Sequence, residues 1–136
     1  MHKRDYLVKQ FEEFGKVMAV LLGLKKDGNF PDFVRTIQES AKKYTQTEIE
    51  FVESIADNDL IHILTADKKL NDEQLKMLAD LMYEKAEYYL HHSQEKEATN
   101  CYKKAYSIYI FLKENATLTY SLDMHYKIEV LSKIIS

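Results

Sequence analysis

The sequence predicts an all-α protein with six or seven helices in antiparallel hairpins. Apolar residues recur at steps of three and four along most of the chain, which is the spacing of one helical face. Leu, Lys, Glu, Ala, Met and Gln, which favour helix, are abundant. Only three Gly and one Pro occur among 136 residues, too few for the turns of an all-β fold. This length, with 46% hydrophobic residues, predicts a single helical domain over residues 1–136.

The first two helices are predicted over residues 3–24 and about 30–44. On the first, one face repeats at helical spacing, and beyond residue 17 the segment is apolar on every side; the face is formed by Leu7, Phe11, Phe14, Met18 and Leu21. Asn29 or Phe30 caps the second helix, and Pro31 occupies its first turn, where a missing N–H is tolerated.

Two short helices are predicted in the middle of the chain. The first runs to about residue 56, and a Thr-x-x-Glu capping box starts it, through either Thr45 and Glu48 or Thr47 and Glu50. The Asp-Asn-Asp stretch at 57–59 then starts the second helix, which directs inward Leu60, Ile63 and Leu64.

Three longer helices complete the chain. Asn71 starts the first with an Asn-x-x-Gln box to Gln74. Ser93 is the expected N-cap of the next, residues 94–114, which directs inward Ala98, Tyr102, Ala105, Tyr109 and Leu112. The last helix, residues 119–135, aligns Tyr120, Met124, Ile128, Leu131 and Ile135.

Small and aromatic residues alternate across the break near residue 93, which is typical of two antiparallel helices in close contact. The spacing of Ala86, Tyr89, Ala98, Tyr102 and Ala105 resembles the tetratricopeptide repeat over residues 79–112. Lys85 departs from this pattern, because the family prefers Leu there, and Ile110 replaces the usual closing Pro. The resemblance implies a right-handed stack of hairpins in which residues 119–135 form a capping helix. The N-terminus also resembles that of an uncharacterised bacterial family of short helical proteins.

The resemblance also implies a partner-binding groove on the first helix of the repeat. The positions that would face this groove are Asp80, Tyr83, Glu87, Leu90 and His91. Repeats that hold a carboxylate use Lys and Asn at such positions, whereas these residues are acidic, aromatic or apolar. We therefore expect a protein or peptide partner with a basic or apolar segment.

The continuous apolar run in the first helix predicts self-association as a homodimer. A surface helix needs only one apolar stripe, so this segment has faces that require a second covering. Burial against a second copy is one solution, and burial inside the chain or against another protein is the alternative. The residues predicted to pair are Val17, Met18, Leu21, Leu22 and Leu24.

Composition argues against several classes of function. The net charge is −3 with both signs interspersed, so neither a nucleic-acid surface nor a membrane anchor is expected. The longest apolar run, residues 17–24, is too short to span a bilayer and does not resemble a signal peptide. The single cysteine, Cys101, is typical of a reducing compartment, so we expect a cytoplasmic protein.

No catalytic or cofactor motif occurs in the sequence. His91 and His92, with Glu87 and Glu95 nearby, suggest a metal site, but the break near residue 93 spoils their helical geometry. Cys101 is expected to be a buried, unreactive thiol. We expect no cofactor and no metal, and a non-enzymatic protein–protein interaction module, an adaptor or small assembly protein. The alternative is a small enzyme or ligand-binding protein with a His, Cys and acid pocket between the hairpins.

Overall fold

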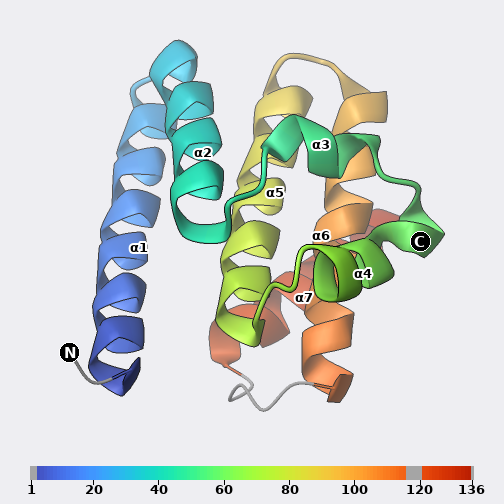
Figure 1. Ribbon diagram of the computed structural model, residues 1–136. Helices are drawn as coiled ribbons and strands as arrows, with labels where there is room; N and C mark the ends of the chain where they lie inside the picture. Colours follow the sequence, from blue (N-terminus) through green and yellow to red (C-terminus); the bar gives the residue numbers. More distant parts are fainter. Residues whose placement is uncertain (1–2, 116–120, 136) are drawn as a thin grey trace.

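The computed structural model describes residues 3–115 and 121–135, and all regular structure in these residues is helical (Figure 1). Because they contain no strand, the all-α prediction is confirmed. A 3₁₀ turn, Asp57–Asp59, precedes α4, and a π-helical turn, Ile63–Asp67, follows it. The described residues contain seven α-helices: α1 (Lys3–Lys26), α2 (Phe30–Thr45), α3 (Ile49–Ser54), α4 (Leu60–His62), α5 (Asp72–His91), α6 (Glu95–Asn115) and α7 (Leu122–Ile135).

The long helices pack in the order of the chain. α1 and α2 form one antiparallel hairpin, α5 and α6 form another, and α2 joins the two by packing against α5 (Figure 1). α7 packs on α6 and lies behind the second hairpin in this view. α3 contacts α2 and α6, and α4 contacts α6, so the short helices cover the side opposite α7 (Figure 1).

The interface between α5 and α6 is the most extensive in the described chain. Ala86, Ala98 and Ala105 are buried there, together with the rings of Tyr102 and Tyr109. Small side chains let the two helices approach, and large aromatic rings fill the space beside them. The small and aromatic pattern therefore specifies this hairpin, as the sequence predicts.

The start of α5 has the predicted capping box. Asn71 Oδ1 accepts a hydrogen bond from the Gln74 amide at 2.8 Å, and Gln74 Oε1 accepts one from the Asn71 amide at 3.0 Å. Gln74 also donates from Nε2 to the carbonyl of Tyr44 at 3.1 Å. The cap therefore fixes the start of α5 and ties it to the end of α2.

We expect Asn71→Ala to lower the free energy of unfolding by about 1 kcal/mol, because one amide of the first turn loses its acceptor. Asn71→Ser keeps a capping oxygen and is the matched control, with an expected change of a few tenths of a kcal/mol. Urea unfolding of both variants measures the difference. Equal losses in the two variants would show that the capping oxygen does not account for the loss of stability.

The predicted role of Ser93 as an N-cap is wrong. Ser93 has a left-handed backbone with φ of 59° and ends α5. The amide of Ser93 donates to the carbonyl of Leu90 at 3.1 Å, and the amide of Gln94 donates to the carbonyl of Tyr89 at 2.9 Å. This pair of bonds is the Schellman ending of a helix, and it requires a left-handed residue after the last turn. The tight connection to α6 therefore dictates the conformation of Ser93.

The two predicted Thr-x-x-Glu boxes before α3 are also wrong. α2 extends to Thr45, whose hydroxyl donates to the carbonyl of Ala41 at 2.6 Å. The hydroxyl of Thr47 donates to the carbonyl of Thr45 at 2.8 Å. Both threonines are buried, so their hydroxyls satisfy carbonyls at the end of α2 and do not cap α3. The residue at the N-cap of α3 is Glu48, which makes no side-chain cap.

The other predicted elements agree with the structure to within a few residues. Asn29 caps α2, with Pro31 in its first turn. Phe14 and Leu21 are buried on α1, as are Met124, Ile128 and Leu131 on α7. The side chain of Leu7 and all of Tyr120, which the sequence assigns to inward faces, lie outside the described residues.

Candidate functional site

The residues predicted to face a partner-binding groove lie at different places on α5. Glu87, Leu90 and His91 line one pocket, which we call the Phe30 pocket, with Lys25 and Phe30. Asp80 lies nearer the start of α5 and is 3% exposed. Tyr83 is half-buried between them, with its ring 5.7 Å from that of Tyr102. The structure therefore gathers three of the five residues into one cavity.

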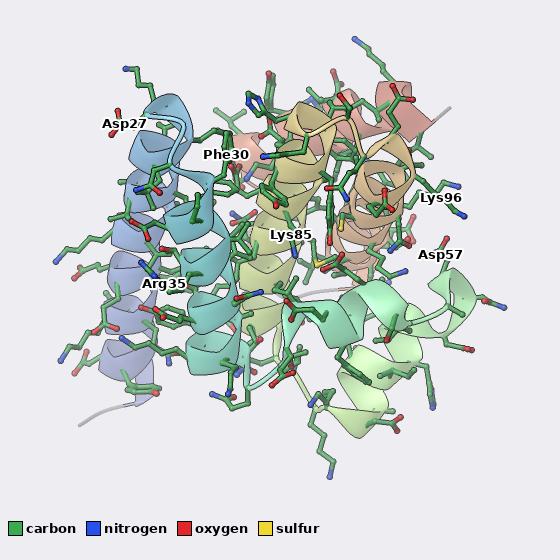
Figure 2. The ribbon with its side chains drawn as sticks, turned by 90° about the horizontal axis from the view of Figure 1, so that it is seen from above. Asp27, Phe30, Arg35, Asp57, Lys85 and Lys96 are labelled. Carbon is green, nitrogen blue, oxygen red and sulfur yellow. The ribbon has the colours of Figure 1, made fainter. Side chains whose placement is uncertain are left out.

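The Phe30 pocket has a volume of about 240 Å³ and an aromatic wall. Phe30 is the first residue of α2 and lies on the side of that helix nearer α5 (Figure 2). The rings of His91 and His92 are 4.5 and 4.9 Å from the Phe30 ring. The His92 ring is 4.4 Å from that of Tyr88, and its Nδ1 is 2.9 Å from the carbonyl of the same tyrosine. Leu90 adds an aliphatic side chain that is 51% exposed. The pocket therefore offers apolar surface to the solvent.

The Phe30 pocket also has an acidic part, formed by Glu87 and by Glu84 next to it. Lys25 on α1 bonds to Glu84 at 2.9 Å and to Glu87 at 3.2 Å, so one ammonium serves two carboxylates of α5. Burial raises the pKa of Glu84 against the opposing effect of Lys25. Burial lowers the pKa of Lys25, but the two carboxylates raise it by more, so its net shift is upward. Because one lysine balances only one of the two glutamates, a negative charge remains at the pocket.

Asp80 belongs to a buried polar network, the Asp80 cluster, that joins α5, α6 and α7. Its Oδ1 accepts hydrogen bonds from the hydroxyl of Tyr109 and from Lys127 Nζ at 3.2 Å. Its Oδ2 accepts one from Lys76 Nζ at 2.7 Å. Both lysines also bond to Asp123, Lys76 at 3.1 Å and Lys127 at 3.4 Å. Asp80 is thus saturated by groups of the chain itself.

The charges of the Asp80 cluster stabilise one another. Burial lowers the pKa of Lys127, but Asp80 and Asp123 raise it by more, so the ammonium form is favoured. Burial raises the pKa of Asp123, but Lys127 and Lys76 lower it by more. Burial raises the pKa of Tyr83 to about 12, and Lys127 Nζ lies 5.4 Å from the centre of its ring. The arrangement supports docking of α7 and presents no reactive group.

A second buried network, the Glu53 cluster, holds α3 against the α5–α6 hairpin. Glu53 accepts hydrogen bonds from Lys85 Nζ at 3.0 Å and from the Tyr89 hydroxyl at 2.6 Å. Its carbonyl accepts one from Asn100 at 2.9 Å. Lys104 bonds to Asn100 and to Asp57, at 3.0 Å in both cases. Figure 2 labels Lys85 in the interior beside α3 and Asp57 at the outer edge.

Sequence reasoning missed the Glu53 cluster, although one signal pointed to it. Lys85 is the position at which the chain departs from the Leu of the repeat pattern. The structure explains the departure, because Lys85 is 4% exposed and its ammonium pairs with a carboxylate from α3. Its partner is 32 residues away in the chain, so no local pattern identifies the pair.

The groups required by the enzyme alternative lie in different surroundings. Cys101 is fully buried, and burial together with Glu53 raises its thiol pKa, which keeps it protonated at neutral pH. The charged groups acting on it include Lys85 and Lys104, whereas His91 and His92 pack around Phe30. Within residues 3–115 and 121–135, no three His, Cys, Asp or Glu side chains are grouped as metal ligands.

The residues predicted to self-associate differ in exposure. Leu21 is fully buried, and Val17, Met18 and Leu24 are half-buried against the core. Leu22 is 61% exposed. The apolar run is therefore only partly core, because Val20, at 53% exposed, and Leu22 both face the solvent.

Four tyrosines on α5, α6 and α7 also differ in exposure. Tyr83, Tyr88 and Tyr106 are half-buried against the core, whereas Tyr126 on α7 is 65% exposed.

Among the described residues, no helix has the length and apolarity required to cross a bilayer.

The fold and these sites define a small all-helical protein built from two hairpins, a terminal helix and a short-helix segment. No family model, curated protein or solved structure matches the chain. The similarity of residues 79–112 to a tetratricopeptide repeat is therefore an inference from the sequence pattern.

Proposed function

We propose that this chain is a non-enzymatic protein–protein interaction module, an adaptor or small assembly protein, that binds a segment of another protein at the Phe30 pocket. The observation that carries the proposal is the pocket itself, where exposed apolar side chains adjoin an incompletely neutralised pair of glutamates. Apolar surface beside a charged rim is typical of recognition sites on proteins. The repeat-like hairpin supports this proposal, since such hairpins serve as binding scaffolds.

The chemistry of the pocket specifies the kind of partner. An apolar side chain of the partner would pack on Phe30 and Leu90, and a lysine or arginine beside it would approach Glu87. We therefore propose a partner segment that carries an apolar residue next to a basic one. The single buried cysteine fits a cytoplasmic location for this interaction.

Affinity capture from native lysate tests the proposal with two pocket variants. We expect wild-type protein to capture a partner that Leu90→Glu and Glu87→Lys capture about tenfold less, because an interface anchor contributes more than about 1 kcal/mol. Leu122→Glu is the matched control, since Leu122 on α7 is 88% exposed and lies outside the pocket. Circular dichroism confirms that each variant is folded.

Two outcomes would contradict the proposal. One is equal capture by wild type and both pocket variants, and the other is the absence of any specifically captured protein.

A captured partner is then divided into overlapping peptides, and the binding peptide must contain the apolar and basic pair. Its affinity must fall as salt concentration rises, because the basic group acts through charge.

The enzyme alternative has less support. It requires a histidine beside an activated thiol, whereas Cys101 is buried next to Glu53 and its pKa is raised. Cys101→Ser is expected to leave partner capture unchanged.

A further inference from the structure

A second apolar surface lies on α1, away from the Phe30 pocket. Its residues recur at alternating steps of three and four, which is the spacing of a helix–helix seam. Phe11 is 39% exposed, Val8 is 51% exposed and Leu22 is 61% exposed. We call this surface the α1 stripe; it comprises Val8, Phe11, Gly15, Met18 and Leu22.

A groove runs beside the α1 stripe. It has a volume of about 410 Å³ and separates α1 from α5 and α7. Four stripe residues and Phe14 form its apolar wall, while Lys76, Asp80, Glu84, Asp123 and Lys127 form the other wall. An exposed apolar ridge and an open groove therefore belong to the same surface. A patch that carries both features is suited to pair with itself around a two-fold axis.

Gly15 lies at the centre of the stripe. A Cβ atom built on Gly15 would meet nothing within 4 Å, so no neighbour in the chain requires a glycine there. Glycine in a helix interior is less favourable than alanine, but it lets another backbone approach closely. Ala19, one turn further on, is also small and exposed. The centre of the stripe thus permits close contact with a second helix.

Two charges near the ends of the stripe favour one direction of pairing. Asp5 precedes Val8 by three residues, and Lys26 follows Leu22 by four; both side chains are exposed. An antiparallel pair of α1 helices places Asp5 of each copy opposite Lys26 of the other. A parallel pair places like charges together. In an antiparallel pair the two helix dipoles also point in opposite directions, which is the favourable arrangement.

We propose that the chain forms a two-fold symmetric dimer through antiparallel pairing of the α1 stripes, with Gly15 of both copies at the axis. Val8 of one copy then faces Leu22 of the other, and Phe11 faces Met18. Leu22 of each copy enters the groove of its partner. This surface and the Phe30 pocket share no lining residue, although Glu84 of the groove bonds to Lys25 of the pocket. The dimer therefore goes beyond the proposed function and does not depend on it.

Sedimentation at micromolar concentration tests the dimer. We expect wild-type protein to sediment at twice the chain mass of 16.0 kDa and Leu22→Asp to sediment as a folded monomer. Leu22 is the informative position, because Leu21 is buried and its replacement by a charge would unfold the chain. Leu122→Asp on α7 is the matched control and should remain dimeric. A wild-type monomer, or a Leu22→Asp dimer, would overturn the proposal.

Disulfide cross-linking tests the direction, in a Cys101→Ser background. Gly15→Cys should cross-link with itself, since a disulfide requires Cα atoms within about 7 Å of each other. Val8→Cys and Leu22→Cys should each cross-link poorly alone and efficiently when mixed. If Val8→Cys and Leu22→Cys each cross-linked efficiently with themselves, the α1 helices would pair in parallel and the antiparallel arrangement would be rejected. Failure of all three, including the mixture, would place the dimer contact elsewhere.

Discussion

Replacement of Asp80 by asparagine is expected to lower the free energy of unfolding by about 3 kcal/mol, because it leaves two partly buried lysines without their main carboxylate. Asp80 is 3% exposed and accepts hydrogen bonds from Tyr109, Lys76 and Lys127. The amide of asparagine keeps one acceptor but removes the charge. Urea unfolding of the variant and of the wild type measures this loss.

Asp123→Asn is the matched control for this prediction. Asp123 bonds to the same two lysines, at 3.1 and 3.4 Å, but its side chain is 52% exposed. An exposed pair contributes at most about 1 kcal/mol, so the control should lose much less stability. Equal losses at the two positions would show that burial of Asp80 gives its ion pairs no additional strength.

The Asp80 cluster connects three helices that are distant in the sequence. Its hydrogen bonds run from α5 to Tyr109 on α6 and to Lys127 on α7, which are 29 and 47 residues from Asp80. α7 buries only three apolar side chains, Met124, Ile128 and Leu131. The cluster therefore contributes directly to fixing α7, and weakening it should release α7 before the hairpin unfolds. Hydrogen exchange of the α7 amides would reveal this order in Asp80→Asn.

The helices could be predicted because their information is local. Apolar spacing located the long helices, and the Asn71–Gln74 box located the start of α5. The sequence alone misassigns Ser93 and the threonines before α3, because a hydroxyl can cap the next helix or satisfy the end of the previous one. Which role it has depends on where the previous helix ends. That endpoint is determined by packing and not by the residue type.

The sites were harder to predict because they depend on contacts between distant segments. The repeat resemblance placed Asp80 on a groove, yet its charge is taken up by lysines of α5 and α7. The same resemblance brought Glu87, Leu90 and His91 together, as the structure does. On α1, the continuous apolar run drew attention to residues 17–24, whereas the α1 stripe starts at Val8. Which face of α1 stays exposed depends on how α1 packs against α2, and not on the residue pattern of α1 alone.

Replacement of Lys85 by leucine, the residue of the repeat pattern, is expected to lower the free energy of unfolding by about 3 kcal/mol. Lys85 Nζ bonds to Glu53 at 3.0 Å and lies 5.0 Å from the centre of the Tyr89 ring. Leucine removes the ammonium and leaves a mostly buried carboxylate with only neutral side-chain partners, the Tyr89 hydroxyl and the Cys101 thiol. Lys96→Leu is the matched control, since Lys96 lies on the exposed side of α6 (Figure 2) and should change stability by less than about 0.5 kcal/mol.

A double-mutant cycle separates the ion pair from packing at this site. Glu53→Gln removes the charge but keeps an acceptor for the Tyr89 hydroxyl, so Lys85→Leu should cost far less in its presence. The expected coupling is about 2 kcal/mol, because a single removal strands one charge while the double removal strands none. If Lys85→Leu were as stable as wild type, the Lys85–Glu53 pair would not hold α3 on the hairpin. A fluorescent probe attached at Phe51→Cys reports whether α3 keeps its contacts. Loss of these contacts in Lys85→Leu would show that the Lys85–Glu53 pair holds α3 on the hairpin.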